Sequence, residues 1–402
     1  MKKVNLIISK NNYLWTNNHT NLLVGDWCMP KDIKNLSFDY KVADDYIETS
    51  KNILKDQQYL KKIYNILLKN ISNRLNNYHS TNLSKQYWEI LINPWLFYFI
   101  DTVFIRWKTI EKIKKKNKNI ETNIYNYKKE YFVANDTHDF KYQSFTNEWN
   151  HWINSIILKH IGGIKIIEKK IKKKYLNIKN VKKKKKISNT INFKCNHKVF
   201  IKNFYLPKFQ KLILNLSYNQ FRYKFDQPDL NQFKADKKRY NIFKKKKTKN
   251  KFFNFINDIA FYLIPKVFVE GYDDTKKKIK YLNWPQNPKI ILTSIEFSTN
   301  EFFKFYTAQK IISGSKFVIA QHGMGDVDKY NLFTYYERKI CNRFLSWGKY
   351  SNNKNVHPLF ATTTSQKKIV KKSSAQGLIV PLYDFFQLPT RIISRPHTVR
   401  GL

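Results

Sequence analysis

The chain has 402 residues, of which 42% are hydrophobic and 16% aromatic, so it can bury cores of ordinary size and is not disordered as a whole. Its formal net charge is +46, from 75 Lys and Arg against 29 Asp and Glu, and such a charge attracts nucleic acid, anionic lipid headgroups and phosphorylated substrates. The three cysteines are too few and too widely spaced for a disulfide framework or a four-cysteine metal site.

The N-terminal region predicts a cytoplasmic protein. Residues 4–8 form an apolar stretch that is too short for a signal-peptide core, and no small-residue cleavage site follows it. The cysteine usage favours a reducing compartment. We therefore expect a cytoplasmic location, with peripheral contact at the inner face of an anionic membrane as a further option. Residues 22–24 then predict a buried strand that ends at Gly25.

Three stretches have the apolar periodicity of helices, at residues 53–75, about 84–115 and 149–161, and the last closes at Gly162. The most apolar part, residues 90–105, is interrupted by Asn93, Pro94 and Asp101. A membrane span needs about 20 apolar residues without such interruptions. We expect a buried helix there, with a helix on the membrane surface as the minority alternative.

Lysine dominates residues 165–186 and 234–251, where apolar periodicity fades. Such stretches are typical of exposed helices or inserted loops. We interpret them as insertions in an N-terminal Rossmann-like domain of residues 1–360, whose helical region spans about residues 50–175.

The last third predicts a βαβ unit. Residues 289–292 and 317–320 are short apolar runs typical of strands, and the helix between them would be capped by Thr299 and end at Gly314. Two strands connected in this way lie parallel and are joined by a right-handed crossover. The predicted fold class is α/β, a Rossmann-like parallel sheet with an extensive helical part.

Gln321, His322 and Gly323 follow directly on the second of these strands. Ligands of open α/β sheets bind outside the carboxyl ends of the strands. His322 can change protonation near neutral pH, and Gly323 with Gly325 would let backbone N–H groups approach a phosphate or a sugar. On spacing alone, a hydrogen-bonded structural histidine is the more frequent outcome.

Other polar residues share this region of the chain. Glu296 follows the first strand of the unit, so it would lie at the same sheet edge, as a general base or as a carboxylate in the first turn of a helix. Glu337 could orient His322 or form a surface salt bridge. Asn331 and Lys339 are candidate substrate-binding residues.

The sequence predicts no metal site. Cys195 and His197 lie close together, but no second pair follows at a spacing used by structural zinc sites. The chain also contains no P-loop, no G-x-G-x-x-G and no G-x-S-x-G motif.

Several sequence blocks are similar, in order and in spacing, to those of one family, the transferases encoded in bacterial O-antigen and surface-carbohydrate clusters. They span about residues 1–350. The blocks are LVGDWC at 23–28, YWEILINPWL at 87–96, NEWNH at 147–151, IAQHG at 319–323, Glu337, and FLSWG at 344–348.

This resemblance implies a two-domain architecture of the glycosyltransferase-B type. It also implies a nucleotide-sugar donor, a saccharide or lipid-linked acceptor, and no cofactor. Met324 stands where the family has a second glycine. Relatives continue beyond the point where this chain stops, so residues 361–402 would hold a linker and, at residues 377–380, only the first strand of an incomplete donor-binding domain.

Three hypotheses follow. In the first, the chain is a glycosyltransferase-like enzyme in which His322 assists proton transfer or phosphate binding without a bound metal. In the second, the lysine runs at 114–116, 182–186 and 244–247 bind nucleic acid, although no binding module accompanies them, and we do not expect this partner. In the third, the chain is a truncated, inactive relative of the transferases.

Overall fold

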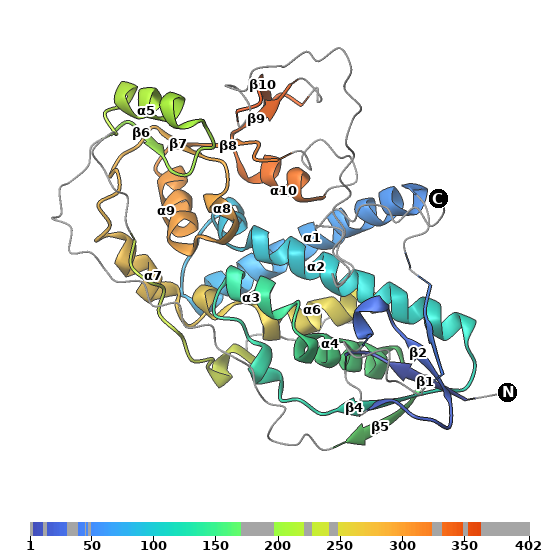
Figure 1. Ribbon diagram of the computed structural model, residues 1–402. Coiled ribbons are helices and arrows are strands. Elements are labelled where there is room, and N and C mark those ends of the chain that lie inside the picture. Colours follow the sequence, from blue (N-terminus) through green and yellow to red (C-terminus); the bar gives the residue numbers. More distant parts are fainter. Residues whose placement is uncertain are drawn as a thin grey trace, which may run out of the picture.

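Two five-stranded parallel sheets and a thick layer of helices make up the molecule (Figure 1). The helical layer, with α1 and α2 at its centre, lies between the two sheets. The architecture confirms the predicted α/β, Rossmann-like fold class. The computed structural model describes residues 3–10, 14–29, 39–44, 46, 50–169, 197–220, 227–240, 248–323, 332–348 and 353–362.

The first sheet has the order β3-β2-β1-β4-β5, and all of its strand pairs are parallel. This is the strand order of a Rossmann fold, in which the direction of winding reverses between β1 and β4. The three inner strands, β2, β1 and β4, contain buried residues because helices lie against the sheet, whereas the edge strands β3 and β5 are more exposed. The strands are β1 (Val4–Ile7), β2 (Thr20–Leu23), β3 (Tyr40–Val42), β4 (Ile120–Tyr125) and β5 (Lys165–Lys169).

The second sheet has the order β10-β9-β8-β7-β6, and it is also entirely parallel. Neighbours in this sheet are consecutive in the chain, so the direction of winding does not reverse. Because all of the strands run parallel, their carboxyl ends lie at the same edge of the sheet. The strands are β6 (Val199–Ile201), β7 (Ile290–Thr293), β8 (Lys316–Ala320), β9 (Arg343–Trp347) and β10 (Val356–Leu359).

The helices vary widely in length, and the two longest form the middle of the molecule. The described α-helices are α1 (Ser50–Tyr78), α2 (Lys85–Lys116), α3 (Thr137–Gln143), α4 (Asn147–Ile161), α5 (Lys208–Ser217), α6 (Lys251–Leu263), α7 (Tyr272–Ile279), α8 (Glu296–Thr299), α9 (Glu301–Ile312) and α10 (Leu332–Ile340). Short 3-10 helices lie at η2 (Asp26–Cys28), η4 (Lys129–Phe132), η6 (Lys237–Tyr240) and η7 (Lys266–Phe268).

Helix α2 lies at the centre of the hydrophobic core of the molecule. By length and composition it could cross a membrane, but its apolar window is completely buried inside the protein. It packs against α4 on the side of the first sheet and against α9 and α10 on the side of the second. Trp95 shows how dense this packing is, since its ring stacks on Phe99 at 5.3 Å and meets the edge of Phe140 at 6.3 Å. The prediction of a buried helix over residues 90–105 is confirmed.

Helix α2 begins, and helix α4 ends, at residues whose local chemistry favours a helix end. Ser84 caps α2, since its side chain accepts a hydrogen bond from the backbone N–H of Tyr87. Helix α4 ends at Gly162, which has a positive φ of 64° that a residue with a Cβ rarely adopts. The predicted helices at residues 53–75, 84–115 and 149–161 thus correspond to α1, α2 and α4.

The βαβ unit of the last third is present, with one correction. β7 and β8 pair in parallel register, with Ile291 opposite Phe317, as predicted. The helix α9 is capped not by Thr299 but by Asn300, whose side chain accepts a hydrogen bond from Phe303 N–H. Thr299 instead is the last residue of a separate short helix, α8, which the periodicity of the sequence did not predict.

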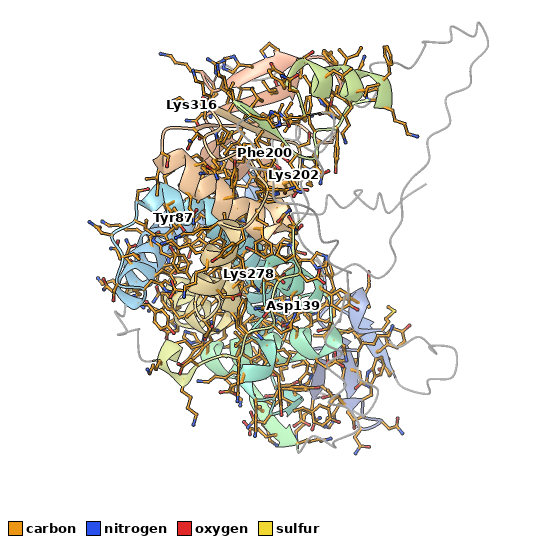
Figure 2. The ribbon with its side chains drawn as sticks, turned by 90° about the vertical axis from the view of Figure 1, so that its left-hand side faces the viewer. Tyr87, Asp139, Phe200, Lys202, Lys278 and Lys316 are labelled. Carbon is orange, nitrogen blue, oxygen red and sulfur yellow. The ribbon has the colours of Figure 1, made fainter. Side chains whose placement is uncertain are left out.

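The lysine-rich stretches contain more regular structure than their composition predicts. Residues 165–169 were expected in an insertion, but they form β5, the edge strand of the first sheet. An exposed edge tolerates the lysines at the two ends of this strand because their ammonium groups reach water. Figure 2 shows a side view, with Phe200, Lys202 and Lys316 at the level of the second sheet and Tyr87 and Asp139 in the helical layer. The runs at 182–186 and 244–247, and the strand expected at 377–380, lie outside the described residues.

Candidate functional site

The carboxyl ends of β6 to β9 lie side by side at one edge of the second sheet. The segments that leave these strands are linked by backbone hydrogen bonds, from Ser294 N–H to the Asn203 carbonyl at 3.1 Å and from Gln321 N–H to the Leu345 carbonyl at 2.8 Å. This is the edge where ligands of parallel α/β sheets bind. It brings the predicted candidates Glu296 and His322 to the same side of the sheet.

Gln321 holds the turn after β8 in shape. Its side chain is fully buried, its Nε2 donates to the carbonyl of Gly323 at 2.8 Å, and its Oε1 accepts from the backbone N–H of Trp347 at 2.6 Å. The amide thus joins the turn to the end of β9. A contact between Gln321 and substrate stays a prediction, since the described geometry gives the residue a shaping role.

His322 and Glu337 form a pair across this edge. The Nδ1 of His322 lies 3.7 Å from Oε1 of Glu337, and the side chains are 23% and 1% exposed, respectively. The distance is that of an ion pair rather than of a direct hydrogen bond. Glu337 was predicted either to orient His322 or to form a surface salt bridge. The burial of Glu337 excludes the surface alternative and leaves the imidazole partly open to solvent.

Helix α10, which presents Glu337, is seated on α1 and α2. The ring of Tyr336 lies 4.3 Å from that of Tyr64 and stacks on Phe97 at 5.2 Å. Asn93 Nδ2 donates to the carbonyl of Tyr336 at 3.3 Å, and its Oδ1 accepts from the hydroxyl of Tyr64 at 2.8 Å. The sequence block at residues 87–96 therefore supports the helix that carries Glu337.

Lys339 also helps to hold α10 against α1 and α2. Its Nζ lies 2.9 Å from Oε1 of Glu89 and 2.5 Å from Oδ1 of Asn65, and it faces the ring of Tyr64 at 4.8 Å. The ammonium therefore ties α10 to α1 and α2. A substrate contact for Lys339 stays a prediction, and the other predicted binding residues, Gly325 and Asn331, lie outside the described side chains.

Lys141 is a site residue that the sequence analysis missed. It lies on α3, its Nζ donates to Oγ of Ser298 at 3.0 Å, and it faces the ring of Tyr98 at 5.6 Å. Burial lowers the pKa of Lys141 to about 8, repulsion from Lys304 adds to the shift, and the negative charge of Glu337 opposes it. Lys141 therefore feels the same carboxylate that faces His322. No motif surrounds it in the chain, so only tertiary structure could identify it.

A buried ion pair fixes α3 in place next to this site. Lys304 is fully buried, and its Nζ lies 2.9 Å and 2.8 Å from the two carboxylate oxygens of Glu301. The same ammonium donates to Oγ1 of Thr137 at 2.8 Å, while Glu301 accepts from the Thr137 N–H at 3.0 Å. Burial raises the pKa of Asp136, the N-cap of α3, and the charge of Glu301 adds to this rise. This network locks the start of α3 onto α9.

Glu296 occupies the first turn of α8 and is mostly buried. Its two carboxylate oxygens accept hydrogen bonds from the side-chain amides of Asn203 and Asn300. Its backbone N–H donates to Oγ1 of Thr293 at 3.1 Å. This environment matches the alternative in which the carboxylate stabilises the start of a helix. A role as general base stays a prediction.

His151, on α4 beside the first sheet, lies near a hydroxyl, but its geometry is structural. The Nε2 of His151 accepts from the backbone N–H of Tyr125 at 2.8 Å, and its Nδ1 lies 2.7 Å from Oγ of Ser9. Because an N–H must donate, Nδ1 carries the proton and donates to Ser9. Burial lowers the pKa of His151 to about 3, so the ring stays neutral and cannot take a proton from Ser9.

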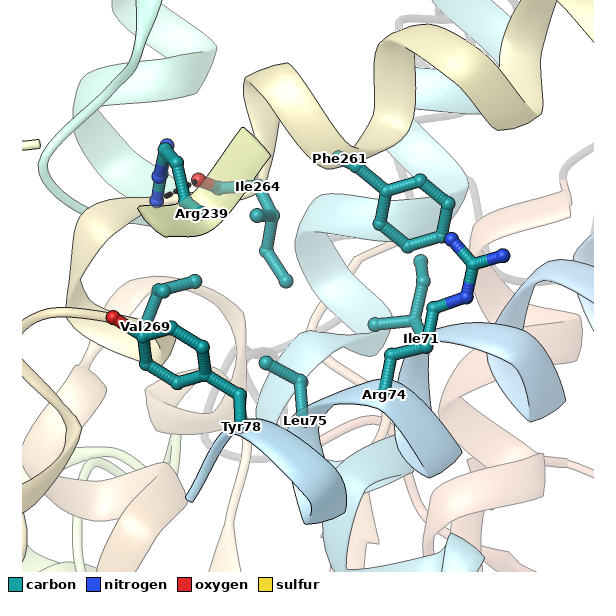
Figure 3. Close-up of a pocket in the computed structure, with 8 residues that line it drawn as sticks. All are labelled: Ile71, Arg74, Leu75, Tyr78, Arg239, Phe261, Ile264 and Val269. Atoms are coloured by element: carbon teal, nitrogen blue, oxygen red, sulfur yellow. Dashed lines mark hydrogen bonds between the residues drawn. The ribbon is translucent and has the colours of Figure 1, made fainter. Parts of the chain in front are cut away.

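Neither a metal site nor a sugar-sized cavity is found in the part of the chain that the structure describes. Among the described residues, no group of three or more His, Cys, Asp or Glu side chains could hold a metal ion. A cavity of about 10 Å³ lies between α1 and α6, lined by apolar side chains such as Ile71 and Phe261 and by Arg74 and Arg239 (Figure 3). Such a volume holds about one water molecule and cannot admit a sugar.

A family model described as "LIC12162 family transferase" matches residues 4–399. No curated protein matches the chain, and no solved structure does.

Proposed function

The chain belongs to the LIC12162 family of transferases, and from that premise we propose that it is a glycosyltransferase of surface-polysaccharide (O-antigen) biosynthesis that uses a nucleotide sugar. Two Rossmann-like sheets around a helical layer are compatible with a glycosyltransferase-B arrangement. The sequence blocks at residues 87–96 and 319–323 support the carbohydrate assignment, because they resemble those of O-antigen transferases. The acceptor would be a saccharide or a lipid-linked saccharide in the cytoplasm.

The observation that carries the proposal is the His322–Glu337 pair at the carboxyl edge of the second sheet, with Lys141 bonded to Ser298 of α8, the helix that follows β7 at the same edge. A glycosyl transfer needs a base for the acceptor hydroxyl and a cation for the departing diphosphate. A histidine backed by a buried carboxylate supplies the first, and a desolvated lysine supplies the second. The three residues come from a strand end and from two different helices, so the fold rather than a local motif assembles them.

In the proposed reaction, the acceptor oxygen attacks the anomeric carbon of the sugar. The bond from that carbon to the diphosphate oxygen breaks, and its electron pair leaves with the nucleoside diphosphate. His322 takes the proton from the acceptor hydroxyl, and the negative charge of Glu337 stabilises the resulting imidazolium. Lys141 stabilises the charge that develops on the diphosphate.

The low pKa of Lys141 supports this division of roles. At pH 7 the ammonium is still mostly charged, since its pKa is about 8. A cation that has already lost much of its hydration attracts a phosphate more strongly than a solvated one does. An anion bound at Lys141 would offset the repulsion between the ammonium groups of Lys141 and Lys304.

The test is replacement of His322, with His357 of β10 as a matched histidine in the same sheet. The full chain and its variants are assayed for nucleoside diphosphate release from uridine-, guanosine- and thymidine-diphosphate sugars, and for restoration of surface polysaccharide in a strain that lacks the gene. We expect His322→Ala to lower turnover about a hundredfold or more, the scale of a lost acid-base group, and His357→Ala to leave it near the wild-type level.

Circular dichroism of each variant is the folding control. Wild-type turnover by a folded His322→Ala variant would contradict the proposed base. Failure of the wild-type chain both to release a nucleotide and to restore polysaccharide would favour the inactive relative instead.

A further inference from the structure

Helix α5 carries an apolar face that points into solvent. Phe209 is 64% exposed, Ile213 48%, Leu216 51% and Leu212 38%. Their spacing of three and four residues places them on one stripe, about 100° wide, along the helix. No residue of α5 is buried. Contiguous exposed apolar patches are rare on soluble proteins and mark a surface that contacts something else.

The opposite side of α5 anchors it to the second sheet. Leu214 packs against the small cluster of Ile201, Phe204 and Ala320. The helix is therefore fixed by its inner side, and the stripe faces away from the protein. Figure 1 shows α5 at the outer edge of the molecule, beside β6. Two half-exposed tyrosines, Tyr205 and Tyr218, flank the helix at its two ends.

Charge decides which partner fits this face. Lys208 and Lys211 are both exposed; Lys208 borders the stripe on the helix surface, whereas Lys211 lies on the flank nearer to Leu214. A second copy of the chain would bring together two proteins of formal charge +46 each. A nucleic acid would match the lysines but not the aliphatic side chains. An anionic lipid surface matches both, because its phosphates attract the lysines and its acyl boundary accepts the apolar stripe.

We propose that α5 docks the protein on an anionic lipid bilayer, with Phe209, Ile213 and Leu216 inserted at the headgroup–acyl boundary and Lys208 on lipid phosphates. Tyr205 and Tyr218 then occupy the headgroup level, where aromatic residues with a polar tip accumulate. The inference concerns binding alone and does not rest on the transferase activity. It also moves the membrane contact away from α2, the apolar helix that the sequence offered for it, to a helix whose apolar side is free of core contacts.

The test is sedimentation of the full chain with vesicles of phosphatidylcholine, with or without phosphatidylglycerol. We expect binding to the anionic vesicles only. Phe209→Ser/Ile213→Ser should raise the lipid concentration for half-binding about tenfold or more, because two large side chains no longer leave water. Ile66→Ser is the matched control, since Ile66 lies on α1 and is 47% exposed.

A second pair of variants separates specific contacts from overall charge. Lys208→Glu should weaken binding about fivefold or more, whereas Lys62→Glu on α1, with the same change in net charge, should weaken it far less. All of these residues are exposed, so the variants should remain folded, which circular dichroism checks. Equal binding of the wild type and the Phe209→Ser/Ile213→Ser variant, or no binding of the wild type to anionic vesicles, would overturn the proposal.

Discussion

Replacing Lys304 with methionine should destabilise the protein strongly, because it would leave Glu301 buried without its cation. The two side chains are 0% and 3% exposed, so water cannot replace the ammonium. Breaking a buried ion pair by removing one partner costs about 3–5 kcal/mol. The loss adds to that of the hydrogen bond to Thr137 at the start of α3. We therefore expect Lys304→Met to lower the free energy of unfolding by about 3–5 kcal/mol.

The double variant Lys304→Met/Glu301→Gln makes the reasoning testable. It removes both charges but leaves an amide oxygen that can still accept from Thr137 N–H, so it should be more stable than the single variant by about 1 kcal/mol or more. Urea unfolding followed by circular dichroism measures both, with the slope compared between variants. A loss below about 1 kcal/mol for Lys304→Met, or a double variant less stable than the single one, would refute the argument.

Two further predictions concern charge and capping. Lys141 is charged below its pKa of about 8 and neutral above it, so kcat/KM of the proposed transferase should fall above pH 8, to about a tenth of its plateau at pH 9. Lys141→Arg should abolish this fall, because arginine keeps its charge; a pH profile unchanged by that substitution would contradict the role of Lys141. Asn300→Ala should lower the free energy of unfolding by about 1 kcal/mol or more, because α9 loses its cap, whereas Thr299→Ala should cost less. Equal costs in urea unfolding would mean that the cap assignment is wrong.

Periodicity was sufficient to predict the parts of the fold whose contacts are local. The apolar stripes of α1 and α4 and the βαβ unit around α9 were visible in sequence, because burial of one face dictates residue type at a fixed spacing. The edge strand β5 was not, since a strand exposed on its outer side selects lysines as readily as a loop does. The cap of α9 was misplaced by one residue because Thr299 and Asn300 are both good caps.

The candidate site was only partly accessible to sequence reasoning. His322 was found from its place after a strand, and Glu337 from the polar series that follows it in the chain, with the family resemblance as further support. Lys141 was not, because its neighbours Ser298 and Lys304 lie more than 150 residues away in the chain and leave no local signal. The outward face of α5 was invisible for a different reason, since an amphipathic helix has the same pattern whether its apolar stripe meets a core or solvent.

The central position of α2 also has a consequence for biosynthesis. α2 ends at residue 116, whereas α9 and α10, which cover one side of it, end at residues 312 and 340. A ribosome that adds about 5–20 residues per second needs roughly 10 to 45 s to produce the missing cover. Throughout that interval a helix apolar enough to cross a bilayer has α1 and then α4 beside it but lacks the cover of α9 and α10. The side of α2 that faces the second sheet is therefore exposed until that part of the chain has been translated.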